Sequence, residues 1–146
     1  MALEPHLKKT PDTELDWFEA LAALARYLRS PEGCPWDRER TTLELAAFVG
    51  EEAKELEEAL ESGDNRHAEE EFGDCLFTLM SCMAAAEEEG RFNLHGALER
   101  AHEKLVRRHA HVFRIDKAVS SEEAMASWQE IKAKEREEQK REKNND

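Results

Sequence analysis

Several common features are missing from this 146-residue sequence, and each absence removes a class of protein. No apolar run approaches the roughly 20 residues that a membrane-spanning helix needs, and nothing in the sequence resembles a signal peptide. Residues that favour β-strands never alternate with polar residues for long, so we expect an all-α chain built as an antiparallel helix bundle. No internal repeat is evident, and the length fits one domain.

Cysteine and positive charge are also scarce. The three cysteines, an odd number, indicate a reducing compartment, and we therefore expect a cytoplasmic protein. The chain has 21 Lys and Arg against 34 Asp and Glu, which gives a formal net charge of −13. This charge argues against broad binding of nucleic acid through the phosphate backbone. A nucleotide is still compatible with it, because a metal ion can carry the phosphates.

Apolar spacing and the placement of proline and glycine predict the organisation of the chain. We expect a flexible arm over residues 1–12, one helical domain over residues 13–136 and a charged, frayed tail over residues 137–146. Within the domain, helices are predicted over 13–28, from 41 to a turn at 62–65, over 65–89, over 93–108 and over 121–136. A fixed loop with two prolines and a glycine follows the first helix. Its Trp36 either plugs the core or lines a pocket, and the plug is the preferred interpretation.

Two acidic pairs stand out on the helices that flank the turn. Glu52 and Glu55 lie three residues apart on the first helix, as do Glu71 and Asp74 on the second. Residues three apart share a helix face, and a short turn makes the helices antiparallel. The four carboxylates can therefore meet across the groove between the helices.

Glu52 occupies an unusual position on its helix. On a helical wheel it falls inside the apolar stripe, between Phe48 and Val49 on one side and Leu56 on the other. Carboxylates rarely face a core unless they are paired, and carboxylates brought together raise one another's pKa. A divalent cation removes that repulsion, and oxygen ligands suit Mg²⁺, with Mn²⁺ as a second candidate. The alternative is a solvated acidic face, which explains most of the other glutamates.

Histidine and basic residues complete the candidate set. The acidic pairs contain no histidine, which argues against a ferritin-like di-iron site. A dense cationic cluster ends the helix over 93–108, and it contains Lys104, Arg107, Arg108 and His109. Arginine suits bidentate contacts with phosphate, although cations also favour a helix C-terminus through the helix dipole. Trp128 lies on the apolar stripe of the last helix, where it either stacks on a base or belongs to the core.

The motifs together resemble the MazG nucleoside triphosphate pyrophosphohydrolases. Their order and spacing, from about Leu21 to Lys134, are the specific feature, and the matching segments are Gly33-Cys34-Pro35-Trp36-Asp37, Glu51-Glu52-x-x-Glu55, Glu71-x-x-Asp74, Glu88-Glu89-Gly90-Arg91-Phe92, Lys104-Leu105-x-Arg107-Arg108-His109-x-His111-Val112-Phe113 and Trp128-x-x-Ile131-Lys132. The resemblance implies an all-α pyrophosphohydrolase fold, assembled as a homodimer or homotetramer. It also implies Mg²⁺-dependent hydrolysis of a nucleoside triphosphate to the monophosphate and pyrophosphate, in nucleotide-pool house-cleaning.

The same resemblance implies roles for individual residues. By motif position the metal ligands would be Glu52, Glu55, Glu71 and Asp74, with Glu51 or Glu52 as a catalytic base. Phosphates would be bound by Lys104, Arg107, Arg108 and His109, and Trp128 would contact the nucleoside. Ala110 stands where the family usually has proline, and Gly50 where a larger residue is common, so the shape of the pocket can differ from the family pattern.

Two other functions fit the same residues. One is a relative with a narrow substrate, such as a dUTPase or a phosphoribosyl-ATP pyrophosphohydrolase. The other is a non-catalytic helical dimerisation module, in which the acidic residues only decorate the surface. Neither alternative involves nucleic acid or a membrane.

Overall fold

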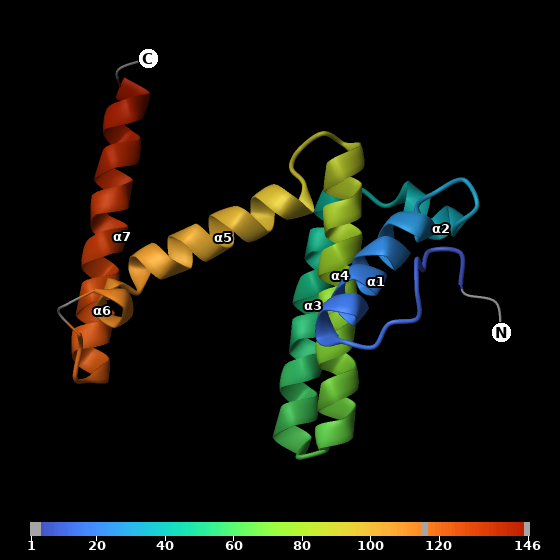
Figure 1. Cartoon of the computed structure of the whole chain (residues 1–146), viewed down its shortest axis with the longest axis horizontal. Coiled ribbons are helices and arrows are strands. Elements are labelled where there is room, and N and C mark those ends of the chain that lie inside the picture. The colour runs from blue at the N-terminus through green and yellow to red at the C-terminus, as the bar shows by residue number, and fades with distance from the viewer. Residues whose placement is uncertain (1–3, 115–116, 145–146) are drawn as a thin grey trace. The chain divides into compact units, whose positions relative to one another are not determined.

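The computed structural model describes residues 4–114 and 117–144, and every regular element in these ranges is a helix (Figure 1). The all-α prediction is therefore confirmed. The helices are α1 (Glu14–Leu28), α2 (Pro35–Glu39), α3 (Thr42–Ser62), α4 (Asn65–Glu88), α5 (Leu94–Arg108), α6 (Ala110–Phe113) and α7 (Ser121–Asn144). None of the described helices has both the length and the apolarity needed to cross a membrane. The chain divides into two compact units, Met1–Leu94 and His95–Asp146.

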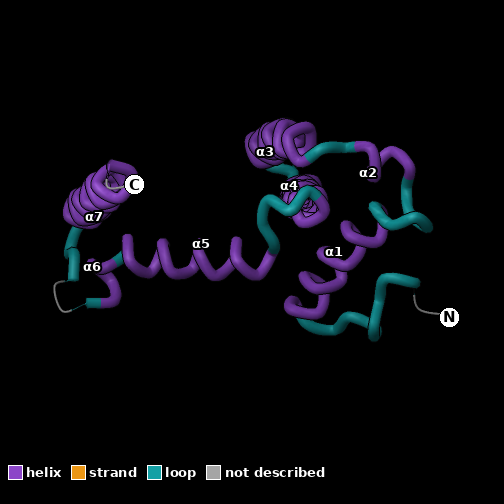
Figure 2. Tube along the Cα trace, turned by 90° about the horizontal axis from the view of Figure 1, so that it is seen from above, coloured by secondary structure: helices purple, strands orange, loops and turns teal. Residues whose placement is uncertain are grey.

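The centre of the first unit is the antiparallel pair formed by α3 and α4, which lie side by side in both ribbon views (Figures 1 and 2). Thr41 and Glu44 form a reciprocal capping box that starts α3, as the sequence predicts. Gly63 ends α3 with a φ of 77°, a left-handed conformation that glycine adopts without steric cost. Asp64 then caps α4 by accepting hydrogen bonds from two backbone amides, those of Arg66 and His67. These local signals fix the tight hairpin that carries both acidic pairs.

Helix α1 packs across α4 through small side chains (Figure 2). The buried cluster at this contact contains Ala22, Ala25, Met80, Met83 and Ala84. Alanine on both helices allows their backbones to approach closely, and the two methionines fill the remaining space. The buried cluster therefore lies in the C-terminal half of α4, away from Glu71 and Asp74 in its N-terminal half.

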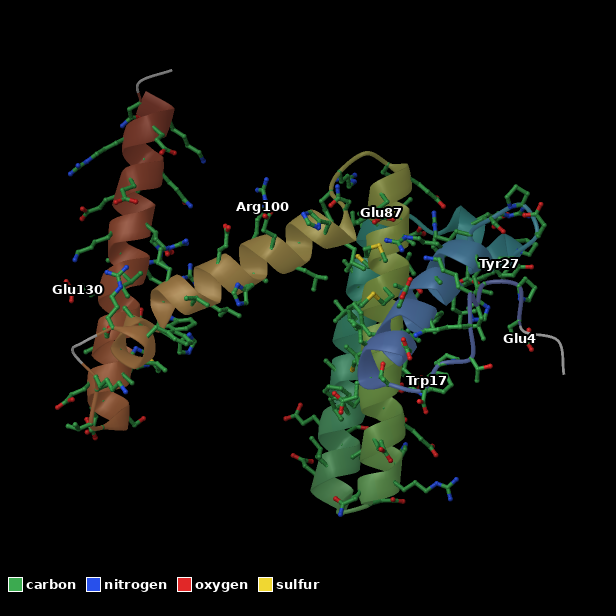
Figure 3. All side chains as sticks on the ribbon, in the orientation of Figure 1. Glu4, Trp17, Tyr27, Glu87, Arg100 and Glu130 are labelled. Carbon is green, nitrogen blue, oxygen red and sulfur yellow. The ribbon has the colours of Figure 1, made fainter. Side chains whose placement is uncertain are left out.

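Two arginines, one in α1 and one at its C-terminal cap, connect this helix to the end of α4. Arg26 forms a two-pronged ion pair with Glu87, which is labelled on α4 in Figure 3. Arg29 is buried, with its side chain only 5% exposed, and binds Glu88 through Nη2 at 2.8 Å. Its Nη1 donates to the carbonyl oxygens of Asp37 and Arg40, which flank the end of α2. Arg29 thus holds the proline-rich segment against the helices.

Gly33 allows that segment to turn. A Cβ at this position would lie 2.3 Å from the carbonyl oxygens of Tyr27 and Leu28, a distance that no side chain tolerates. The segment then forms the short helix α2, where we expected only a loop, because Pro35 is suited to the first position of a helix. Trp36 is 51% exposed, so the preferred interpretation of this residue as a core plug is wrong.

The second unit has the predicted helix over residues 94–108, the additional short helix α6 and the long helix α7. Helix α7 continues to Asn144, beyond the predicted end at residue 136. Its C-terminal half consists mostly of Glu, Lys, Arg and Gln, which have high helix propensity, and an ion pair between Lys134 and Glu130 adds i,i+4 support. Glu130 is labelled on this helix in Figure 3.

The N-terminal arm follows α1 over its described residues 4–12. Lys8 pairs with Glu19 at 3.0 Å, and Lys9 pairs with Asp16 at 2.6 Å. The ring of His6 lies 6.2 Å from that of Tyr27, at the other end of α1. These contacts give the arm a defined path along the helix, although exposed ion pairs of this kind contribute little stability.

Replacing Arg29 by alanine should lower the free energy of unfolding by about 2–3 kcal/mol, because the carboxylate of Glu88 and two loop carbonyls lose a charged donor. Arg26→Ala is the matched control, since Arg26 is half exposed and its loss should cost about 1 kcal/mol or less. Urea unfolding of both variants measures the difference. Equal losses would show that the buried position of Arg29 has no special importance.

Candidate metal centre

Helices α3 and α4 bring three of the four predicted metal ligands together. Glu52 and Glu55 project from one face of α3, and Glu71 projects from the facing side of α4. Each offers a carboxylate oxygen, and these three oxygens all lie within 4.8 Å of one another. Glu52 and Glu71 are partly buried, whereas Glu55 is exposed. The prediction that residues 52, 55 and 71 converge across the hairpin therefore matches the geometry.

Asp74 and Glu51 lie at the edge of this group. Asp74 is exposed and is not among the three residues whose oxygens converge. It lines the same small cavity as Glu52, and its charge contributes to the raised pKa of Glu52. Glu51 is exposed and has the smallest of the four carboxylate effects on that pKa. Asp74 is thus a neighbour of the converging group, and Glu51 is an outer carboxylate.

The electrostatics of Glu52 show that several negative charges surround its carboxylate. Burial raises the pKa of the Glu52 carboxyl, and the charges of Glu55, Asp74 and Glu71 raise it further. The pKa of the Cys75 thiol is raised by the same causes, burial first and then the surrounding carboxylates. The thiol therefore stays protonated near neutral pH and is a poor nucleophile. Among the described residues, His67 Nε2 is the nitrogen placed beside this cluster, 2.8 Å from Glu71 Oε1.

The donor set fits a hard divalent cation. All its ligand atoms are carboxylate oxygens, as Mg²⁺ and Mn²⁺ prefer. In an octahedral Mg²⁺ site with bonds of about 2.1 Å, neighbouring oxygens lie about 3.0 Å apart and opposite ones about 4.2 Å apart, so the carboxylate oxygens would have to move by about 1–2 Å to close around an ion. A bound cation would also remove the repulsion that raises the pKa of Glu52.

A small cavity of about 260 Å³ adjoins the carboxylates. Glu52 and Asp74 form one part of its wall, and the aromatic rings of Trp36, Phe48 and Phe77 form another. The Trp36 and Phe48 rings are 5.9 Å apart and tilted by 37°, and the guanidinium of Arg40 lies 5.0 Å from the centre of the Trp36 ring. Thr78, Ser81 and Asp37 add polar groups. The alternative interpretation of Trp36, that it lines a pocket, is therefore the correct one.

The predicted phosphate-binding residues belong to the second unit, and two of them, Arg108 and His109, lie beside Trp128. The ring of His109 meets that of Trp128 edge-on at 5.0 Å, and its Nδ1 donates to the carbonyl oxygen of Leu105. The Arg108 guanidinium lies 5.5 Å from the centre of the Trp128 ring. Arg107 and Arg108 both bind Glu135 of α7. Lys104 is exposed on α5.

Sequence reasoning missed Glu135, which lies in a run of charged residues. The available signal was its spacing, because Glu135 follows Trp128 by seven residues and so lies on the same face of α7.

Comparison with known proteins identifies the family of the chain. Residues 40–113, which span α3, α4, α5 and α6, match the model of the MazG nucleotide pyrophosphohydrolase domain. The chain belongs to the MazG family. The crystal structure of a MazG-related protein from Thermotoga maritima is similar to this structure, with a TM-score of 0.65 and 29% sequence identity over 77% of this chain and 96% of that one. The resemblance stated from the motifs is therefore confirmed.

Curated relatives of this MazG chain are longer than it is. A nucleoside triphosphate pyrophosphohydrolase of Escherichia coli K12 is 37% identical over 84% of this chain and 47% of its own length. The nucleoside triphosphate pyrophosphohydrolase/pyrophosphatase MazG of Thermotoga maritima is 38% identical over 82% of this chain and 45% of its own length. The uncharacterized protein YabN of Bacillus subtilis is 37% identical, and the match spans 24% of it. This chain thus spans between a quarter and a half of these relatives.

In the absence of metal, Glu52→Gln should make the protein more stable. It should also remove the stabilisation that Mg²⁺ gives to the wild type. Since the folded protein raises the pKa of Glu52, the ionised carboxylate destabilises the fold, and stability should fall as pH rises through that pKa. Glutamine removes the charge and with it this pH dependence. Mg²⁺ at a hundredfold excess over its Kd should stabilise the wild type by about 2.7 kcal/mol, and the variant far less.

Melting temperatures with and without millimolar Mg²⁺, in parallel at pH 5 and pH 8, measure both effects. Glu57→Gln is the control, because Glu57 is an exposed glutamate of the same helix outside the converging group. An equal Mg²⁺ response in the wild type and in Glu52→Gln would show that the three carboxylates are not the metal site.

Proposed function

We propose that this chain hydrolyses nucleoside triphosphates to the nucleoside monophosphate and pyrophosphate, with Mg²⁺ or Mn²⁺ held by Glu52, Glu55, Glu71 and Asp74. One water molecule is consumed: its oxygen forms a new bond to phosphorus, and the bond to the bridging oxygen between the α- and β-phosphorus atoms breaks. The observation that carries the proposal is the convergence of three carboxylate oxygens within 4.8 Å on the α3–α4 hairpin of a MazG chain.

Different charged residues of the chain have different roles in this reaction. A bound divalent cation supplies charge neutralisation for the polyphosphate and lowers the pKa of water. Glu51 is exposed beside the ligand group and is available to accept a proton from the attacking water. Lys104, Arg107, Arg108 and His109 provide the positive charge that a departing pyrophosphate requires. The assignment of these four residues rests on their motif positions in the family.

The cavity beside the carboxylates is suited to the nucleoside. Its volume of about 260 Å³ is large enough for a base and part of a sugar, and Glu52 and Asp74 in its wall lie next to the metal-binding oxygens. The Trp36 and Phe48 rings offer a stacking surface, which every nucleobase can use. We therefore place the base against Trp36.

Exposed apolar side chains on α4 support a homo-oligomer. Phe72 and Leu79 are seven residues apart and so lie on one side of the helix, and both are about half exposed. A second copy of the chain would bury them. We propose a homodimer or homotetramer that acts in the cytoplasm on the nucleotide pool.

Pyrophosphate release from a panel of canonical and damaged nucleoside triphosphates tests the proposed reaction. With Mg²⁺ present, Glu52→Gln and Asp74→Asn should each lower kcat/KM by at least about a hundredfold, as is common when a charge-stabilising group is lost from an active site. Glu57→Gln should keep the wild-type rate. Full activity in both site variants would disprove the assignment, and activity on a single nucleotide would indicate a narrow-substrate enzyme.

Trp36→Ala should raise KM for all nucleotides in the panel by about tenfold, because the base loses a stacking partner, and should change kcat much less. Trp17→Ala is the matched control, since Trp17 (labelled in Figure 3) is a 61% exposed tryptophan on α1 that does not line the cavity. If KM is unchanged in Trp36→Ala, the base binds elsewhere.

A further inference from the structure

Glu135 holds both arginines of the cationic cluster with one carboxylate. Its Oε1 accepts a hydrogen bond from Arg107 Nε at 2.6 Å. Its Oε2 accepts two from Arg108, from Nε at 3.1 Å and from Nη2 at 2.9 Å. The Glu135 side chain is only 15% exposed, which is low for a helix whose neighbouring residues are nearly all exposed. This contact joins the end of α5 to the middle of α7 within the second unit.

Arg108 is fixed from a second side. Its guanidinium lies 5.5 Å from the centre of the Trp128 ring, on the same face of α7 as Glu135. The side chain of Arg108 is 19% exposed, whereas that of Arg107 is 50% exposed. The arginines also hold the pKa of the Glu135 carboxyl below its usual value, with hydrogen bonding from Arg108 as the largest cause. Glu135 is therefore ionised near neutral pH.

The contact leaves the arginines able to bind an anion. Two guanidiniums carry ten N–H donors in all, and the three hydrogen bonds to Glu135 use three of them. One carboxylate also neutralises only one of the two positive charges. Phosphate oxygens can thus bind the remaining donors while Glu135 keeps its own hydrogen bonds.

We propose that Glu135 is a positioning residue for the polyphosphate: it fixes the Arg107 and Arg108 guanidiniums side by side before the substrate binds. This inference rests on the proposed function, in which the two arginines bind phosphate. Arginine has a long flexible side chain, and ordering two of them in advance lowers the entropy cost of binding. The charge that Glu135 removes matters less, because one carboxylate leaves the two guanidiniums with a net positive charge for the phosphate.

Two other roles for Glu135 would give different experimental results. If Glu135 only competed with phosphate for the arginines, its replacement would tighten polyphosphate binding. If it only stabilised the contact between α5 and α7, its replacement would lower the fraction of folded enzyme, and so kcat, without changing the affinity of the molecules that remain folded.

The test measures binding of inorganic tripolyphosphate with Mg²⁺ by calorimetry, so that the result does not depend on the nucleobase. Glu135→Gln should weaken tripolyphosphate binding about tenfold, the loss expected when one charge-assisted hydrogen bond no longer orders its partner. KM for the nucleotide should rise by a similar factor while kcat changes less than about twofold. Glu137→Gln is the matched control, since Glu137 is exposed and lies on the opposite side of α7.

A double-mutant cycle separates this inference from the proposed function. Arg107→Ala/Arg108→Ala should weaken tripolyphosphate binding on its own, and adding Glu135→Gln to that variant should have no further effect. If the arginine variant binds as the wild type does, the phosphate role of the arginines is wrong and the inference falls with it. If the arginine variant binds weakly but Glu135→Gln binds as well as or better than the wild type, only the positioning role of Glu135 is wrong.

Discussion

Repulsion among carboxylates on the α3–α4 hairpin is the constraint on which the account depends. Glu52, Glu55 and Glu71 bring oxygens within 4.8 Å of one another, and burial together with neighbouring charges raises the pKa of Glu52. Such an arrangement opposes folding, because like charges at short range disfavour the ionised state. The hairpin tolerates it because its caps at Thr41, Gly63 and Asp64 and its core near α1 lie elsewhere along the helices. The stability of these parts of the hairpin thus permits the repulsion among the carboxylates between them.

The candidate site residues of the two units carry charges of opposite sign. The first holds the acidic group and the aromatic cavity, and the second holds the arginines, which Glu135 and Trp128 keep in order. In each unit, several charges of one sign lie close together, and neighbouring opposite charges compensate them only in part. Carboxylates suit a divalent cation, and guanidiniums suit phosphate oxygens, and these are the two components of a metal complex of a polyphosphate.

Much of this structure follows from local sequence signals. The starts of α3 and α4, the turn between them and the face shared by Glu52 and Glu55 depend on capping and helical periodicity, which act over a few residues. The exposure of Trp36 and of Phe72 was not predictable in this way, because it depends on what packs against each helix and not on the helix itself. Glu135 was missed for the same reason: its two partners lie 27 and 28 residues away, at the end of another helix.

X-ray diffraction from crystals grown with Mn²⁺, with data collected near its absorption edge, tests the central claim most directly. The account predicts an anomalous peak within bonding distance, about 2.2 Å, of carboxylate oxygens of Glu52, Glu55 and Glu71, with Asp74 as a further ligand, and no such peak in crystals of Glu52→Gln. Well-ordered Mn²⁺ at other residues, with these carboxylates turned into solvent, would contradict it.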